Sequence, residues 1–393
     1  MADRRARRSR GRRPKRKPSG KKRIATGGFY DYSLLFLVIF LVCFGLIMIY
    51  STSYYSATIY KSDPMYYLKR QGLLAAAGVV AMIIVSKIDY RKFLKPLFKS
   101  KMSLPVLLML LSILLQIYVL INGVDLNGAK RWISLGPLGT FQPSDFAKVA
   151  TIIFVAYVIY QKPSWPSSLQ GFMRISVLVG IDIVLIAVEN VSTAIVMCLI
   201  LGGMCFVASY KKGFYFLIVG LGVFAFAMVI IFGEGFRLGR VVSWLNVETD
   251  DGAFQILQGL YAIASGGVFG KGLGQSVQKL GFVPEAQNDM IFTIICEELG
   301  LVGACVVLLL FIMVLWRIFQ IVVNSPDLFG GMIGVGVLIH LAAQVLLNVA
   351  VVTNTIPSTG VALPFISYGG TSVAMLLVEV GLVLSVSNQV TAE

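Results

Sequence analysis

Long apolar runs, separated by short polar segments, recur along the chain from about residue 30 onward. Most of these runs approach the roughly 20 residues that an α-helix needs to cross the hydrocarbon core of a bilayer. The pattern predicts an all-α polytopic membrane protein whose ten-span domain covers residues 29–388, with a long loop, 233–290, between helices 7 and 8. We place the ten transmembrane helices at residues 31–50, 71–87, 104–121, 142–160, 172–188, 191–209, 214–232, 291–316, 331–351 and 366–386.

The composition agrees with a membrane protein. Of the 393 residues, 57% are hydrophobic and 13% are charged, against about 25% charged residues in soluble domains. The five cysteines form no CxxC pair, and the single histidine, His340, lies inside an apolar run. Zinc sites need more such ligands at close spacing. We therefore predict no metal ligand set and a packed or hydrogen-bonded His340.

The net charge of +15 comes mostly from a basic tail, residues 1–28, which we expect to be disordered. Residues 1–23 hold 13 Lys or Arg and one acid. Ahead of a membrane span, such a tail favours a topology anchor or a contact with anionic lipid over a nucleic-acid partner.

The distribution of the other basic residues tests the orientation of the spans. With the tail inside, the inner segments hold 24 Lys and Arg and the outer segments hold 9. The rule that cytoplasmic loops are richer in Lys and Arg places both termini, including residues 389–393, in the cytoplasm. The 233–290 loop is then extracytoplasmic, and the polar motifs described next fall mainly on the outer face.

The first polar motif, residues 122–148, contains several turn-forming glycines beside Lys130 and Arg131. It ends with Gln142 and Ser144 at the start of a helix, where Pro143 suits the first turn. Lys148 follows within an apolar segment, where its charge is costly unless Asp145 pairs with it. A structural ion pair and a contact with an anionic substrate are equally supported here.

The second motif, residues 265–300, is rich in glycine and carries Lys271, Lys279 and Glu285. Asp289 follows, at the predicted outer end of the eighth helix. An N-cap would stabilise the charge of Asp289 and lower its pKa, whereas a general base needs access to a hydroxyl group. Glu297 and Glu298 lie further along the helix, and because neighbouring residues cannot face one cavity, at least one needs a separate partner.

The third motif, residues 356–372, contains prolines and glycines that favour a broken or re-entrant segment lining a cavity. Ser367, Tyr368, Thr371 and Ser372 place hydroxyl groups there. We expect Glu379, further along, to pair within the bundle. Upstream, Arg237 and Arg240 add two cations to the long loop.

Together these motifs resemble the SEDS family (shape, elongation, division, sporulation), which includes FtsW-like and RodA-like proteins. The resemblance covers nearly the whole chain after the tail, and residues 272–286 are more similar to division-type FtsW than to elongation-type RodA. Asp145, Asn288 and Met290 replace the family's usual Glu, Thr and Phe. The matching stretches are Gly128–Ile133, Gln142–Lys148, Val283–Gly300 and Pro357–Ser372.

The resemblance implies a peptidoglycan glycosyltransferase that polymerises lipid II outside the bacterial cytoplasmic membrane during division, with Asp289 as the catalytic base. It implies as partners an undecaprenyl-linked glycan, a class B penicillin-binding transpeptidase, other division proteins and membrane lipid. A divalent cation, Mg²⁺ or Mn²⁺, is compatible with a diphosphate leaving group. The alternatives are a lipid II flippase and an elongation- or sporulation-type polymerase.

Two groups of residues accompany Asp289 in this interpretation. The candidate diphosphate ligands are the basic side chains near the outer face: Lys130, Arg131, Lys148, Arg237, Arg240, Lys271 and Lys279. The candidate supporting residues are Gln142, Ser144, Asp145, Glu285, Glu298, Ser367, Tyr368, Thr371 and Ser372.

Overall fold

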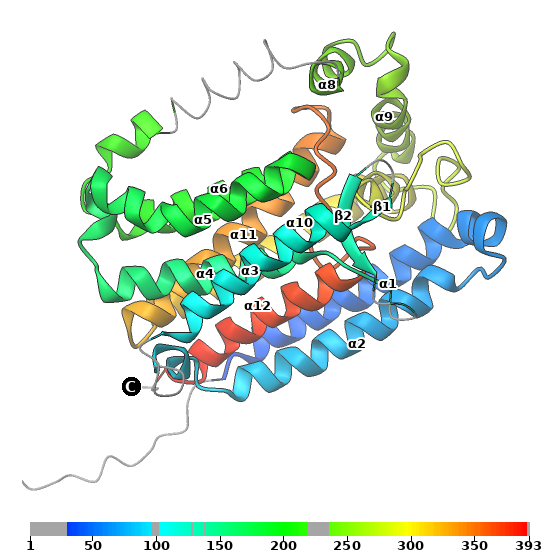
Figure 1. The fold of residues 1–393 in the computed structure, drawn as a ribbon. Helices are drawn as coiled ribbons and strands as arrows, with labels where there is room; N and C mark the ends of the chain where they lie inside the picture. The colour runs from blue at the N-terminus through cyan, green and yellow to red at the C-terminus, as the bar shows by residue number, and fades with distance from the viewer. Residues whose placement is uncertain are drawn as a thin grey trace, which may run out of the picture.

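The computed structural model describes residues 30–95, 102–126, 129–134, 136, 139–218, 220 and 236–390. Long helices dominate them (Figure 1), and eight are long and apolar enough to cross a membrane. These eight are α1 (Tyr32–Lys61), α2 (Tyr66–Lys87), α3 (Leu104–Asn122), α4 (Pro143–Gln161), α5 (Leu169–Glu189), α6 (Val191–Ala208), α10 (Ile291–Val323) and α11 (Leu328–Val352). A ninth apolar helix, α12 (Thr371–Ser387), has 17 residues.

These nine helices match nine of the predicted spans. The remaining span, 214–232, lies mostly outside the described residues, as does the predicted basic tail, 1–28. Helix α1 continues to Lys61, beyond the expected end at residue 50. Hydropathy falls there, but the chain meets no helix-breaking residue until Ser62 adopts a left-handed conformation (φ 54°) and Pro64 follows.

The helices pack closely where small residues let their backbones approach. Helix α12 runs along α2, α3 along α4, and α10 along α11. A Cβ atom at Gly78 of α2 would lie 2.9 Å from the Cα atom of Ala374 of α12. At one end of the bundle the backbone N–H of Asp31 donates to Ser387 Oγ at 3.3 Å. We call this the terminal end, because it holds both described chain ends, and the opposite one the site end.

The terminal end also carries two short 3₁₀ helices, η1 (Tyr90–Leu94) and η3 (Trp165–Ser167). An ion pair at the same end joins α10 to the start of α1, with Arg317 Nη2 2.7 Å from Asp31 Oδ2.

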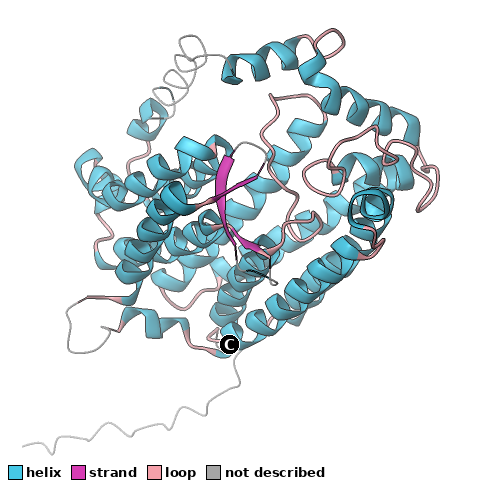
Figure 2. Ribbon diagram, turned by 45° about the vertical axis from the view of Figure 1, so that its right-hand side comes forward, coloured by secondary structure: helices cyan, strands magenta, loops and turns pink. Residues whose placement is uncertain are grey.

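A small antiparallel sheet at the site end departs from the all-α prediction (Figure 2). It consists of β1 (Val124–Leu126), β2 (Ala129–Ser134) and β3 (Thr140–Phe141), in the order β1-β2-β3. Asp125 pairs with Lys130, and Ser134 pairs with Thr140. Only turns were predicted here, because strands this short show no clear alternation of polar and apolar residues.

The predicted 233–290 loop contains helices of its own. These are α8 (Phe236–Leu245), the 3₁₀ helix η4 (Asp251–Ala253) and α9 (Phe254–Gly266). Helix α9 runs across the site end and not along the bundle (Figure 1). Helix α10 is interrupted at Gly300 (φ 69°, ψ −169°). A Cβ atom there would lie 2.3 Å from the backbone nitrogen of Gly270, so only glycine fits this break.

Candidate functional site

Asp289 lies in the turn that precedes α10, at the site end. The N-cap position of α10 is Met290, which makes no side-chain cap bond, so Asp289 is not the helix cap. Burial raises the pKa of the Asp289 carboxyl to about 6. Its own backbone N–H and the Arg240 guanidinium oppose this rise, and the Glu285 carboxylate adds to it. The lowered pKa expected of an N-cap is therefore not found, and the raised value suits proton abstraction near neutral pH.

The backbone of Asp289 is fixed by a side chain that the sequence analysis did not single out. Asn348, in the last turns of α11, donates from Nδ2 to the carbonyl oxygen of Asp289 at 2.7 Å. The same Nδ2 donates to the carbonyl oxygen of Val361 at 2.9 Å. The Asn348 amide thus joins α11, the turn at Asp289 and the segment around Val361. The Asp289 carboxylate lies beside Gly360, where a Cβ atom would be 3.6 Å from Asp289 Oδ2.

Residues 353–370, which we call the return segment, are irregular, as the prolines and glycines predicted. Side chains from the site end hold this segment in place. Arg240 donates from Nη1 to the carbonyl oxygen of Ser358 at 3.3 Å, and Ser192 donates to that of Thr359. Trp244 of α8 donates from Nε1 to the carbonyl oxygen of Asn354 at 2.9 Å. Helix α8 is therefore bound to the return segment next to Asp289.

Two arginines lie near one another at the site end, and one of them, Arg240, acts on the Asp289 carboxyl. The charge of Arg240, on α8, acts both on Asp289 and on Arg131, which lies on β2. Burial lowers the pKa of Arg131, the charge of Arg240 lowers it further, and Glu189 opposes both. Two neighbouring guanidinium groups repel each other unless an anion comes between them. The pair is therefore suited to a multiply charged anion.

Arg131 also borders a pocket between α3, β2, the start of α4 and the turn from α5 to α6. Its lining includes Gln116, Lys130, Arg131, Gln142, Ser144 and Glu189. The backbone N–H of Lys130 donates to Glu189 Oε2 at 3.1 Å, and Gln142 Nε2 donates to Ser144 Oγ at 2.8 Å. Gln116 Nε2 and Arg131 Nε are buried without a hydrogen-bond partner among the described residues. The pocket therefore offers donors to an acceptor-rich ligand.

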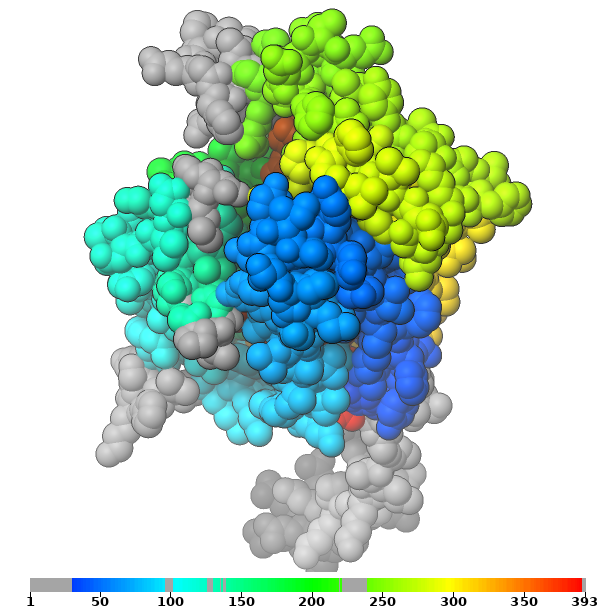
Figure 3. Space-filling model, turned by 90° about the vertical axis from the view of Figure 1, so that its right-hand side faces the viewer, coloured from blue at the N-terminus to red at the C-terminus, as the bar shows by residue number. Residues whose placement is uncertain are grey.

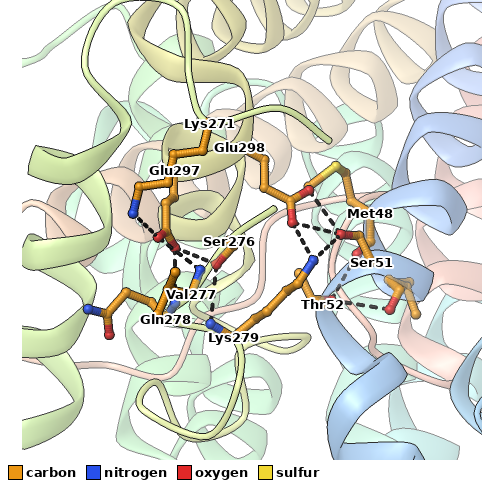
Figure 4. A network of polar contacts seen from close by, with 11 residues as sticks. Met48, Ser51, Thr52, Lys271, Ser276, Val277, Gln278, Lys279, Glu297 and Glu298 are labelled. Carbon is orange, nitrogen blue, oxygen red and sulfur yellow. Dashed lines mark hydrogen bonds and ion pairs between the residues drawn. The ribbon is translucent and has the colours of Figure 1, made fainter. Parts of the chain in front are cut away.

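Three of the candidate lysines are paired with acids. Lys148 Nζ lies 2.8 Å from Asp145 Oδ1, and both side chains are buried. Lys271 Nζ lies 2.7 Å from Glu297 Oε1. Lys279 Nζ lies 2.7 Å from Glu298 Oε1 and 3.0 Å from Ser51 Oγ (Figure 4). The side chain of Arg237 lies outside the described residues.

The two neighbouring glutamates of α10 have separate partners, as their adjacency predicted. Glu297 accepts from Lys271, from the Ser276 hydroxyl and from the backbone N–H of Val277 at 3.1 Å. Glu298 accepts from Lys279 and from Ser51 Oγ, at 2.8 Å to Oε1. Figure 4 shows that the two carboxylates point apart and contact different residues of the same loop.

The predicted supporting hydroxyls mainly hold the return segment. Ser367 Oγ accepts from the backbone N–H of Leu363 at 2.8 Å, and Thr371 donates to the carbonyl oxygen of Thr140 at 3.4 Å. The Tyr368 ring packs against Tyr67, and Ser372 lies in the first turn of α12. Gln71 of α2, which sequence reasoning missed, accepts from the backbone N–H of Gly370 at 3.1 Å.

The missed residues share one sequence signal. Gln71, Gln116 and Asn348 are amides within apolar helices, where an unsatisfied polar group is costly. Each of them marks a place where a helix meets the site end. The spacing of the motifs gave no reason to connect them with Asp289.

A buried pair occupies the interior of the bundle. His340 Nδ1 lies 2.7 Å from Glu379 Oε2, which confirms the predicted hydrogen-bonded histidine and the pairing of Glu379. Within the described ranges, no group of three or more His, Cys, Asp or Glu side chains is arranged to hold a metal ion.

The fold and the site define a class: a multi-pass helical membrane protein with a carboxylate and two arginines at one membrane face. The family model for the FtsW, RodA and SpoVE cell cycle proteins matches residues 32–392. The chain belongs to this family. Among curated relatives, stage V sporulation protein E of Bacillus subtilis is 37% identical over 91% of this chain and 96% of that protein. The probable peptidoglycan glycosyltransferase FtsW of Geobacter sp. strain M18 is 34% identical over 92% and 97%.

Solved structures agree with the fold. A chain of a peptidoglycan synthase complex, described as coordinating polymerisation and crosslinking, aligns with a TM-score of 0.73 at 24% identity. The alignment covers 93% of this chain and 99% of that one. The rod shape determining protein RodA of Thermus thermophilus aligns with a TM-score of 0.67 at 25% identity, over 93% of this chain and 98% of that one.

Proposed function

We propose that this protein is a peptidoglycan glycosyltransferase that polymerises lipid II at the outer face of a bacterial cytoplasmic membrane. The observation that carries the proposal is the placement of Asp289 at a membrane face, beside the return segment that Arg240 holds, with Arg131 next to Arg240. Relatives named probable peptidoglycan glycosyltransferase FtsW, which match nearly the whole chain, support the activity. We further propose a role in septal wall synthesis during division, with a sporulation-type polymerase as the alternative that the similarity to stage V sporulation protein E favours.

The reaction requires a base and a charge-neutralising site. The hydroxyl oxygen of the acceptor sugar attacks the anomeric carbon of the donor, and the Asp289 carboxylate takes the hydroxyl proton. The bond between the anomeric carbon and the diphosphate oxygen breaks as the new glycosidic bond forms. The electron pair leaves with the diphosphate, whose charge Arg131 and Arg240 stabilise. Asp289 then releases its proton to water.

The paired lysines have a different role in this proposal. Lys148 and Lys279 are buried with their acids, and removing either from its partner would leave a buried carboxylate uncompensated. We therefore assign them, with Lys271, to the architecture of the site. Lys130 and Arg237 remain predicted diphosphate ligands. A divalent cation would be held by the substrate phosphates and would neutralise the leaving group, because the described residues form no ligand cluster for it.

We further propose that the site end faces outward and that both termini are cytoplasmic. The contact between Asp31 and Ser387 supports placing the two chain ends on one side, and the basic residues support the direction. The partner would be a class B penicillin-binding transpeptidase, by analogy with the complex that coordinates polymerisation and crosslinking.

Purified Asp289→Asn protein tests the activity. Polymerisation of lipid II should fall by about 10²–10⁴-fold, the usual contribution of a positioned base. The matched control is Asp63→Asn, which removes an exposed carboxylate whose partner is Lys69. Near-normal glycan synthesis by Asp289→Asn would refute the assignment. A wild-type preparation that moves lipid II across vesicles without polymerising it would support the flippase instead.

A further inference from the structure

Residues 267–282, which we call the inverted loop, bury two polar side chains, Ser276 and Lys279, and expose most of their large apolar side chains, while Lys271 and Gln275 are also exposed. Ser276 is 3% exposed and Lys279 is 8% exposed, whereas Phe269 is 84% exposed. The large hydrophobic residues exposed along the loop are Val268, Phe269, Leu273, Val277, Leu280 and Phe282. Loops in water show the opposite pattern, and clustered exposed apolar side chains mark a surface that something covers.

The inversion has a local cause. At the break in α10, Glu297 and Glu298 are fully buried and draw Ser276 and Lys279 inward (Figure 4). The break also frees backbone carbonyls, and the loop supplies their donors. The N–H of Lys271 donates to the carbonyl oxygen of Glu297 at 3.0 Å, and that of Gly272 donates to Glu298 at 2.9 Å. The inward face is therefore satisfied by polar contacts, which leaves the apolar side chains to point outward.

The depth of the loop can be measured along α1. Ser51, which bonds both Glu298 and Lys279, lies about 28 Å from Tyr32 at a rise of 1.5 Å per residue. The hydrocarbon core of a bilayer is about 30 Å thick. With Tyr32, at the terminal end, taken as the level of the opposite interface, the loop lies at the membrane interface on the site end. Exposed tyrosines at positions 50, 54 and 55 of α1 mark the same level, as an aromatic belt does.

The loop is continuous with a lipid-facing surface. The N–H of Leu301 donates to the carbonyl oxygen of Gly267 at 2.9 Å, and that of Val302 donates to Val268 at 3.1 Å. Leu301 is 60% exposed and begins the apolar face that α10 presents along the bundle. Phe269 therefore lies at the edge of the apolar surface of α10 that lipid tails cover. In Figure 3, residues of α9 and the loop (yellow to yellow-green) lie on the surface beside α1.

We infer that the inverted loop inserts into the lipid leaflet at the site end, with Phe269 as its anchor, and so is not a water-exposed loop. This insertion goes beyond the proposed function, because it sets the depth of the site end relative to the lipid headgroups. A diphosphate attached to a polyprenyl chain lies at that level. The occupant is phospholipid, because the depth and the continuity with α10 both place the loop against the leaflet.

Photo-crosslinking tests the insertion without depending on catalysis. Phe269 is replaced by benzoylphenylalanine, and the full-length protein is reconstituted in nanodiscs of phosphatidylethanolamine and phosphatidylglycerol. After irradiation, mass spectrometry should detect phospholipid adducts at position 269. The matched control is the same replacement of Tyr60, an aromatic residue that is 77% exposed. It lies about 42 Å along α1 from Tyr32, beyond the hydrocarbon core, so it should give at least fivefold fewer lipid adducts.

Two outcomes would overturn the inference. One is equal lipid labelling at positions 269 and 60. The other is labelling of a co-reconstituted transpeptidase at position 269 with loss of the lipid adducts, which would make the loop a protein interface. Neither outcome depends on Asp289, so failure of this inference is distinguishable from failure of the proposed activity.

Discussion

At the scale of single residues, the chemistry of the site depends on how Asp289 is surrounded. Its carboxyl is buried enough to raise its pKa to about 6, and it is not used to cap α10. Its backbone carbonyl is held by Asn348, so the carboxylate has a fixed position beside the return segment. A base of this kind is ionised at neutral pH and still accepts a proton readily.

The raised pKa predicts a pH dependence of activity. Because Asp289 must be ionised to act as a base, the polymerisation rate should rise as pH increases through about 6 and level off above pH 7. Initial rates with saturating lipid II between pH 5 and 8 would measure this. A rate that is flat down to pH 4.5 would contradict the assignment.

The same pKa predicts a stability effect of the opposite kind. The folded state holds the Asp289 proton more tightly than the unfolded chain, whose pKa is near 3.8. Folding stability is therefore lost as pH rises from about 4 to 6 and stays lower above that range. Asp289→Asn removes this penalty, so its thermal unfolding temperature should exceed that of the wild type at pH 7.5. The difference should shrink toward pH 4, and a difference that grows at low pH would oppose this account.

Asn348 is expected to act through the position of Asp289. Asn348→Leu keeps the branched shape of the side chain but removes the amide that holds the Asp289 carbonyl, so kcat should fall by about ten- to a hundredfold with little change in KM. The acid limb of the pH profile should also move to lower pH, because a released carboxyl is better hydrated. Gln344→Leu, a similarly buried amide one turn inward on α11, is the control. Equal effects of the two variants would indicate a purely structural role.

At the scale of elements, the break in α10 organises the loop that carries the site. The sequence placed a helix here from its apolar run, but the run could not show that Gly300 divides it. The break depends on a distant contact, since the Gly270 backbone occupies the space that a side chain at position 300 would need. The helices α8 and α9 were missed for a related reason. They are short and lie across the site end, so their amphipathic faces depend on what they cover.

The two lysine–glutamate pairs should differ in their contribution to stability. Lys279→Met leaves Glu298 buried with Ser51 alone, so it should destabilise the protein by about 3–5 kcal/mol. Lys271→Met should cost less, because Lys271 is partly exposed and Glu297 keeps Ser276 and Val277 as donors. Thermal unfolding in detergent measures both variants. Adding Glu298→Gln to Lys279→Met should recover part of the loss, and no recovery would argue against an uncompensated charge as the cause.

At the scale of the whole molecule, the site is assembled from segments far apart in the chain. Arg131 comes from β2, Arg240 from α8 and Asp289 from the turn before α10. Asn348 and the return segment complete the surroundings from the C-terminal part of the bundle. The bundle therefore works as a frame that brings an acid and two cations to one membrane face.

Loss of either arginine should weaken catalysis. Arg131→Gln and Arg240→Gln should each reduce polymerisation by about 10²–10³-fold, the effect of removing one group that stabilises developing charge. Arg174→Gln is the control, because that residue lies over Trp165 at the terminal end. Polymerisation assays with purified lipid II would show the difference. Equal activity of the Arg131, Arg240 and Arg174 variants would remove the two arginines from the site.

The sequence by itself determined that the chain crosses a membrane many times, because the length of an apolar run and the thickness of a bilayer are local quantities. It also singled out Asp289, because an acid beside a membrane segment is costly wherever the chain folds. Only the tertiary structure decided which cations meet that acid. Each of seven basic side chains could pair with any nearby carboxylate. In the folded protein Lys148, Lys271 and Lys279 form ion pairs with acids other than Asp289. Electrostatic pairing depends on distances of a few ångströms between remote segments, and those distances exist only in the folded bundle.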